Sequence, residues 1–119
     1  MSLKIIALTA MLTIVAAPVL AEDKPIDMSK PMGNHDAASH AFSKANAKMH
    51  KDMMIEYSGD ADADFVRGMI PHHRGAIDMA KIELQYGKDP DIRKLAESVI
   101  KAQEAEIAAM NAWLRTEGK

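Results

Sequence analysis

Cysteine is absent from this 119-residue sequence, and the absence excludes several kinds of site. Without thiols the chain forms no disulfide scaffold, cysteine-ligated zinc site, iron–sulfur cluster or c-type haem attachment, and it has no cysteine nucleophile. Aromatic residues are scarce as well, at 4%, and the net charge of −2 lacks the basic excess of nucleic-acid-binding proteins. The length suits one small domain and excludes a doubly wound nucleotide-binding enzyme or a (β/α)₈ barrel.

Residues 1–21 resemble a secretory signal peptide. Lys4 supplies the positive charge, residues 5–17 form an uncharged apolar stretch, and small or aliphatic residues precede the end of the segment at Ala21. A membrane anchor is the alternative, but a span requires about 20 apolar residues. We therefore expect cleavage after Ala21, a periplasmic or secreted location, and no stable membrane insertion of the mature chain.

The remaining sequence predicts an arm followed by three helices. Residues 22–35 contain proline and glycine without apolar periodicity and are expected to form an extended or flexible arm. Apolar residues then recur at helical spacing in residues 36–57, 62–86 and 90–116. No segment alternates with period two, so we expect no sheet. The prediction is an all-α antiparallel helical bundle over residues 36–119.

Local signals define the ends and the buried sides of these helices. The expected end signals are Asn34 or Asp36 for the first helix, Asp62 or Asp64 and the C′ residue Gly87 for the second, and Asp89 before Pro90 for the third. The expected buried residues are Phe42, Met49, Met53 and Tyr57; then Val66, Met69, Ile70, His73, Ile77, Ala80 and Leu84; and finally Ile92, Leu95, Ala96, Val99, Ile100, Gln103, Ile107, Met110 and Leu114. Pro71 removes a backbone donor within the second helix and predicts a kink. Three helices with few aromatics give a thin core, so we expect self-association to complete a four-helix bundle.

The residue present in excess is methionine, with ten copies beside five histidines. In the second predicted helix, Met69 lies three and four residues before His72 and His73, and Met79 lies two turns beyond His72. These spacings place two imidazoles and two thioethers along one side of a helix. The alternative is that the methionines belong to the core and the histidines are hydrogen-bonded, since a buried imidazole needs partners for both nitrogens.

Further methionines and histidines precede this helix. The candidates in the first helix are His40, Met49, His50, Met53 and Met54, and those in the arm are Met28, Met32 and His35. For Met49 and Met53 a role in a methionine-lined core is an equal alternative. Thioether sulfur is a soft, uncharged ligand that selects Cu(I) or Ag(I), and imidazole adds affinity and also accepts Cu(II). These twelve residues are therefore the predicted copper ligands.

Other metal and catalytic chemistries are not supported. A di-iron carboxylate site needs Glu-x-x-His motifs, whereas Ala47, Met69 and Ile70 stand three residues before the candidate histidines. A zinc protease would need His-Glu-x-x-His, which is absent, and no serine elbow is present. The acidic residues Asp78, Glu83, Glu97, Glu104 and Glu106 are expected to form a solvated charged face. We therefore expect no enzymatic activity, with copper-dependent oxidation of Cu(I) as a minor alternative.

The sequence of residues 64–80, which contains Met-Ile-Pro-His-His, resembles the secreted family known as domain of unknown function 305. Gln103-Glu104-x-Glu106-Ile107 and Met110-x-x-Trp113-Leu114 resemble its final helix. The resemblance implies a ferritin-like helical bundle and, through CopM-like periplasmic relatives, copper binding by Met and His in copper resistance. Met69, His72, His73 and Met79 match the family motif directly.

Together these observations predict a periplasmic Cu(I)- or Ag(I)-binding protein that acts as a copper chaperone or a sequestering buffer. Its expected partners are copper ions, a copper-delivery protein and a second copy of itself, with no nucleic acid. The alternative is a metal-free helical interaction module of the cell envelope, since methionine-rich surfaces adapt to many partner shapes.

Overall fold

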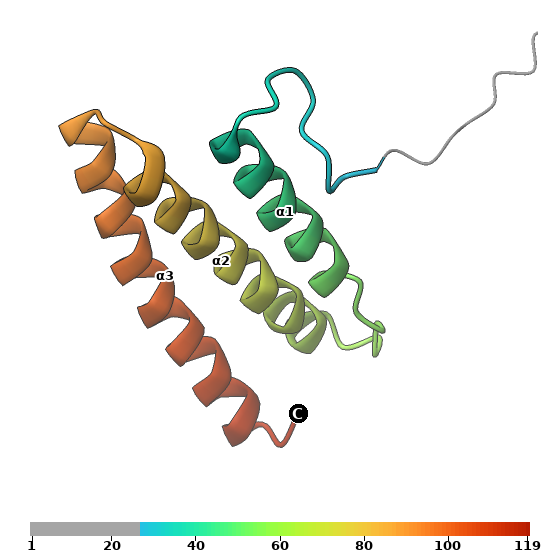
Figure 1. The fold of residues 1–119 in the computed structure, drawn as a ribbon. Coiled ribbons are helices and arrows are strands. Elements are labelled where there is room, and N and C mark those ends of the chain that lie inside the picture. The colour runs from blue at the N-terminus through green and yellow to red at the C-terminus, as the bar shows by residue number, and fades with distance from the viewer. Residues whose placement is uncertain (1–26) are drawn as a thin grey trace, which may run out of the picture.

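A computed structural model describes residues 27–119, so the predicted signal peptide and the start of the predicted arm lie outside the described residues. Within this range the chain has three helices and no strand: α1 (Ala37–Asp52), α2 (Ala61–Tyr86) and α3 (Pro90–Thr116). Successive helices run antiparallel (Figure 1). The all-α antiparallel class and the number of long helices are confirmed.

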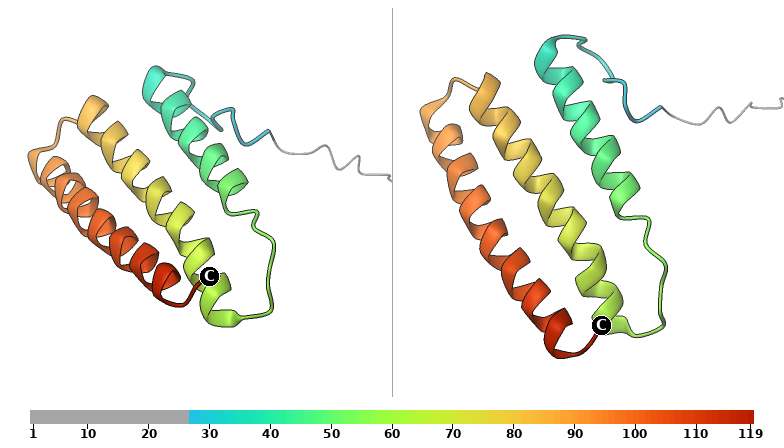
Figure 2. Two further views of the ribbon diagram at one scale, coloured as in Figure 1. Left: turned by 90° about the horizontal axis from the view of Figure 1, so that it is seen from below. Right: turned by 60° about the horizontal axis from the view of Figure 1, so that its bottom comes forward.

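The helices form one row with α2 in the middle. α2 packs against α3 on one side and against α1 on the other, while the backbones of α1 and α3 are not in contact with each other (Figures 1 and 2). The bundle is therefore open, because no fourth helix within residues 27–119 covers the groove between the outer helices. None of the helices that the structure describes is long and apolar enough to cross a membrane.

Each helix begins at an aspartate whose carboxylate accepts hydrogen bonds from the first turn. Asp36 accepts from Ser39 N–H at 2.8 Å, and Asp89 accepts from Asp91 and Ile92 N–H at 2.9 and 3.1 Å, as predicted. For α2 the N-cap is Asp60 and the helix begins at Ala61. Asp62 and Asp64 lie in its first turn, as predicted.

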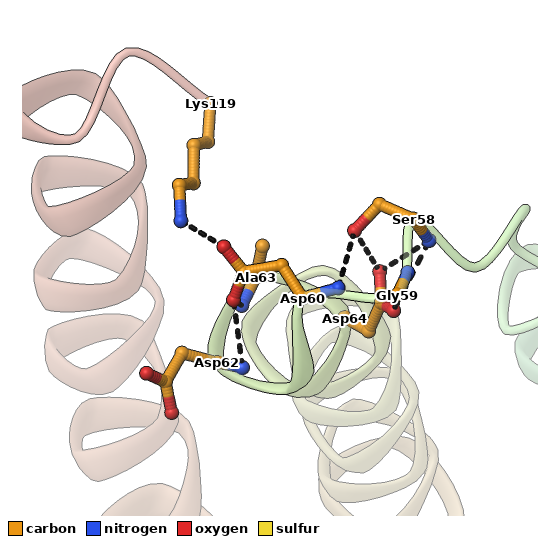
Figure 3. A network of polar contacts seen from close by, with 7 residues as sticks. All are labelled: Ser58, Gly59, Asp60, Asp62, Ala63, Asp64 and Lys119. Carbon is orange, nitrogen blue, oxygen red and sulfur yellow. Dashed lines mark hydrogen bonds and ion pairs between the residues drawn. The ribbon is translucent and has the colours of Figure 1, made fainter.

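Asp64 also holds the connection that leads into α2. Its carboxylate accepts hydrogen bonds from the backbone and hydroxyl of Ser58 at 2.9 and 2.8 Å and from the backbone of Gly59 at 3.1 Å, while Asp60 also pairs with Lys119 (Figure 3). The Ser58 backbone hydrogen bond lowers the pKa of Asp64 below its usual value. Hydrogen bonding to Lys119, and then to Ala63, lowers the pKa of Asp60. Both carboxylates are thus stabilised in their ionised form.

The first helix ends earlier than predicted. The expected helix reached residue 57, but α1 ends at Asp52 with Met53 as its C-cap, and residues 54–60 form a non-helical connection. Tyr57, expected in the core, is therefore 81% exposed. The connection places the Ile55 side chain beside Gly68 of α2, 3.8 Å from the position of a Cβ there. Ile55 thus packs against α2 and the helix ends, although the helical spacing of Met49, Met53 and Tyr57 continues beyond this point.

α2 ends just before Gly87, which does not adopt the left-handed glycine conformation that the sequence predicted. Gly87 is the C-cap, but its φ of −71° is not left-handed, so the predicted C′ role is wrong. The Glu83 side chain occupies the space where a Cβ of Gly87 would lie. Arg93 of α3 donates to the carbonyls of Leu84 and Gly87 at 2.8 and 3.0 Å. A side chain from the next helix therefore satisfies carbonyls at this helix end.

The core is small and centres on α2. Its buried apolar residues are Ala45, Ala63, Ile70, Ile77, Ala80 and Ala96, and no large side chain of the described residues is fully enclosed. The predicted stripe of α2 is buried or half-buried throughout. In α3 the prediction was wrong for Ile92 and Leu95, which are 47% and 57% exposed, because no fourth helix covers their side of the row. The predicted kink at Pro71, which is buried inside α2, stays a prediction.

Gly75 allows the closest approach of α1 to α2. A methyl group added at Gly75 would overlap the Met49 side chain, which therefore packs directly on the α2 backbone. At Gly68, by contrast, an added methyl group would meet only Ile55 at ordinary contact distance, 3.8 Å. The two glycines lie on the same side of α2, seven residues apart, and differ in the space above them.

This difference predicts opposite effects of the same substitution. We expect Gly75→Ala to lower the free energy of unfolding by about 1–3 kcal/mol, because the overlap forces α1 away from α2. Gly68→Ala is the matched control, and it is expected to be neutral or stabilising by up to about 1 kcal/mol through helix propensity. Urea denaturation followed by circular dichroism measures both, and equal effects would contradict the close packing of Met49.

The Asp64 contacts predict a dependence on acid. The lowered pKa of Asp64 means that its contribution to stability is present above its unfolded value, near 3.8, and is lost as the pH falls through the folded value. We expect Asp64→Asn to lower the melting temperature at neutral pH and to reduce its decline below pH 4. Thermal unfolding as a function of pH measures this. Asp62→Asn, in the same turn, is the control, and an identical profile for both variants would refute the role of Asp64.

Candidate metal centre

His73 is the one predicted ligand that the structure places in the core. It is 8% exposed, and both ring nitrogens have protein partners. Nδ1 donates to the carbonyl of Met69 at 2.8 Å, and Nε2 lies 2.5 Å from Oε2 of Glu106 on α3. Since a carbonyl only accepts, Nδ1 is the donor in this contact, and Nε2 faces the carboxylate of Glu106. A metal ion at Nε2 would have to replace Glu106.

Glu106 corrects the sequence prediction, which placed it on a solvated charged face. Its side chain is 59% exposed, which agrees with that pattern, but its Oε2 pairs with His73. The pair joins α2 to α3 across 33 residues of sequence. Its effect is to hold the imidazole in a fixed orientation at the base of the groove between the two helices.

Two thioethers flank this pair. A groove of about 340 Å³ between α2 and α3 is lined by Phe65, Met69, His73, Glu106, Ala109 and Met110. Met110 was predicted only as a core residue of the third helix. In the structure its side chain borders the same groove as Met69. The sequence pattern did not indicate this residue as a candidate ligand, because its proximity to Met69 depends on how α3 packs against α2.

Met69 also borders a second groove, on the side of α1. This groove, of about 280 Å³, is lined by Met53, Ile55, Tyr57, Asp64, Phe65, Gly68 and Met69. Met53, Met69 and Met110 therefore come from three different segments and line two adjoining grooves, with Met69 shared. We refer to these three residues as the thioether row.

The other predicted ligands of α2 are separated from this row. His72 is exposed, and its ring centroid lies 6.0 Å from that of His73. Met79 is 44% exposed and lines a further apolar groove with Phe42 of α1 and Leu95 of α3. The helical spacing placed these four residues on one side of a helix. The structure brings Met69 and His73 together and leaves Met79 nearer the other end of α2.

The candidates in and near α1 fall into two sets. Met49 packs on Gly75, while His50 is exposed and Met54 is 84% exposed. In the arm, Met28 and Met32 line a groove of about 200 Å³ with Ser43 and Asn46 of α1. His35 and His40 lie nearby in sequence, with ring centroids 6.0 Å apart. The described part of the arm thus lies against α1 and carries a second group of methionines and histidines.

A different kind of metal site would be built from histidine and carboxylate side chains. Across residues 27–119, no group of three or more histidine, aspartate or glutamate side chains is arranged to hold a metal ion. The potential donors gathered around Met69 include the thioethers of Met53 and Met110.

The chain belongs to the family described as domain of unknown function (DUF305), whose model matches residues 5–114. The family resemblance seen in the sequence is thereby confirmed. A relative, the uncharacterized protein L153 of Acanthamoeba polyphaga mimivirus, is 45% identical over 53 residues. The aligned part covers 44% of this chain and 35% of that protein, so the chain spans about a third of the relative's length.

The pairing of His73 with Glu106 predicts a stability effect. We expect Glu106→Ala to lower the free energy of unfolding by about 1–3 kcal/mol, because it leaves a buried ring nitrogen without its partner. Glu104→Ala, two residues away and exposed, is the control and should change stability by no more than about 0.5 kcal/mol. Urea denaturation of both variants is the measurement, and a neutral Glu106→Ala would argue against the pair.

Proposed function

We propose that this protein binds Cu(I), and by the same chemistry Ag(I), as a chaperone or sequestering buffer outside the cytoplasm, in the manner of the CopM-like members of its family. The observation that carries the proposal is the thioether row beside His73. Neutral sulfur donors select soft monovalent ions, and imidazole can add to the same site.

The surroundings of the row fit a soft ion better than a hard one. Of the two carboxylates that border the grooves, Asp64 accepts hydrogen bonds from Ser58 and Gly59, and Glu106 pairs with His73. The remaining lining of both grooves is mainly apolar. Hard ions such as Mg²⁺ require several oxygen ligands, which are already engaged here.

The arrangement also suits capture and transfer more than permanent storage. Thioethers carry no proton, so binding at sulfur alone displaces none, and the groove beside α1 opens to the surface. The group of Met28, Met32, His35 and His40 beside α1 offers a second set of similar donors. Transfer of copper would then proceed by ligand exchange between these donors and those of a partner protein.

The test is an anaerobic Cu(I) titration against a chromophoric chelator, with the exported protein purified and its N-terminus identified by mass spectrometry. The triple variant Met53→Leu, Met69→Leu, Met110→Leu preserves side-chain volume and removes only sulfur. We expect it to weaken Cu(I) binding at least tenfold, which corresponds to about 1.4 kcal/mol. Met54→Leu is the matched control and should bind like the wild type, since this side chain lies away from both grooves.

Two further variants locate the site. His72→Ala and His73→Ala, made separately and together, distinguish the exposed imidazole from the buried one. Binding retained by the triple variant but lost on replacing Met28, Met32 and His35 would move the site to the arm. If the protein does not compete with the chelator at all, copper binding is rejected in favour of the metal-free interaction module.

A further inference from the structure

The side of the row that bears the grooves carries two parallel stripes with heptad spacing. Residues follow one another at alternating intervals of four and three along both α2 and α3. We call these positions the open face: Phe65, Met69, His72, Ala76, Met79 and Glu83 of α2, and Leu95, Val99, Ala102, Glu106, Ala109 and Trp113 of α3. This spacing is the one by which helices pack knobs into holes.

The open face is not covered within the described chain. Phe65 is 65% exposed, Leu95 57% and Met79 44%. Three grooves lie along it between α2 and α3, from the end with Trp113 to the end with Ile92, and Phe42 of α1 borders the last of them. α2 and α3 already use a different stripe, with Ile70, Ile77 and Ala96 buried, to pack against each other. The heptad positions are therefore a second apolar surface.

The opposite side of α2 has a different character. Arg67, Arg74 and Lys81 follow one another at intervals of seven, so they share a side that does not belong to the open face. On the open face itself the charged groups are Glu83 and Glu106, and Glu106 is paired with His73. One surface of the row is thus suited to burial and the other to water.

We propose that the open face binds the open face of a second copy of this chain, so that two α2–α3 hairpins form a four-helix bundle with α1 on its outside. A helical partner is indicated by the heptad spacing on both helices. A second copy supplies that spacing on two adjacent helices, and an isologous contact requires this kind of self-matching patch.

The size of the face is adequate for a stable dimer. From residue 65 to residue 83 it extends about 27 Å at 1.5 Å per residue, and it is two helices, or roughly 20 Å, wide. The flat outline of this face therefore measures roughly 500 Å². Because side chains make the accessible surface larger than its outline, the accessible area is of the order of the 800 Å² that each partner contributes to a standard interface. A dimer would also bury apolar side chains that the monomer leaves exposed, because no large side chain of the described residues is completely enclosed in the monomer.

The test is the molar mass of the metal-free exported protein, measured by sedimentation equilibrium over a concentration series with a copper chelator present. The expected mass is twice that of the chain. Ala102→Glu places a charge in the centre of the open face and should raise the dimer dissociation constant at least a hundredfold. Ala108→Glu, on the side of the same helix that faces away from the open face and also exposed, should leave the dimer intact.

Leu95→Gln provides a second variant, since it alters an exposed side chain and spares the buried core. Circular dichroism establishes that each variant remains helical, and monomerisation of helical Ala102→Glu and Leu95→Gln supports the proposal. A wild-type monomer at all concentrations would overturn it, as would a dimer unaffected by either open-face variant or abolished equally by Ala108→Glu. Because no copper is present, failure here leaves the proposed function to its own titration.

Discussion

The structure depends on one constraint, namely that α2 packs on two opposite sides at once. Toward α3 it uses Ile70, His73 and Ile77, and toward α1 it uses the groove that Gly75 opens for Met49. The row of helices, the small core and the exposed grooves all follow from this division. A helix with two neighbours on opposite sides leaves its remaining two sides without cover, and the sequence makes one of these charged and the other apolar.

The regular features of the fold were predictable because they depend on neighbours in sequence. Helical periodicity defined α2 and α3 almost to their ends, and Asp36 and Asp89 act as caps through hydrogen bonds to residues two or three positions away. The errors arose where distant segments decide. Tyr57 continued the helical spacing of Met49 and Met53, but Ile55 packs beside Gly68 and the helix ends before it.

The candidate site was predictable to a similar extent. The sequence identified Met69 and His73 in the family motif and Met53 in the preceding helix, because methionine and histidine at helical spacing stand out from the rest of the chain. It gave no sign of Met110 or of the Glu106 partnership, since both depend on the register between α2 and α3. A glutamate that is more than half exposed looks like any other solvated residue until its partner 33 positions earlier is known.

The absence of backbone contact between α1 and α3 has a consequence for the order in which parts of the molecule unfold. α1 is held by α2 alone and is the shortest helix, so the region that includes it is expected to have the lowest free energy of local unfolding, and its amides should exchange with solvent before those of the α2–α3 hairpin. Detachment of α1 would expose Gly75 and separate Met53 from Met69. Access to the groove beside α1 is thus coupled to the least stable part of the fold, while the groove beside α3 stays intact.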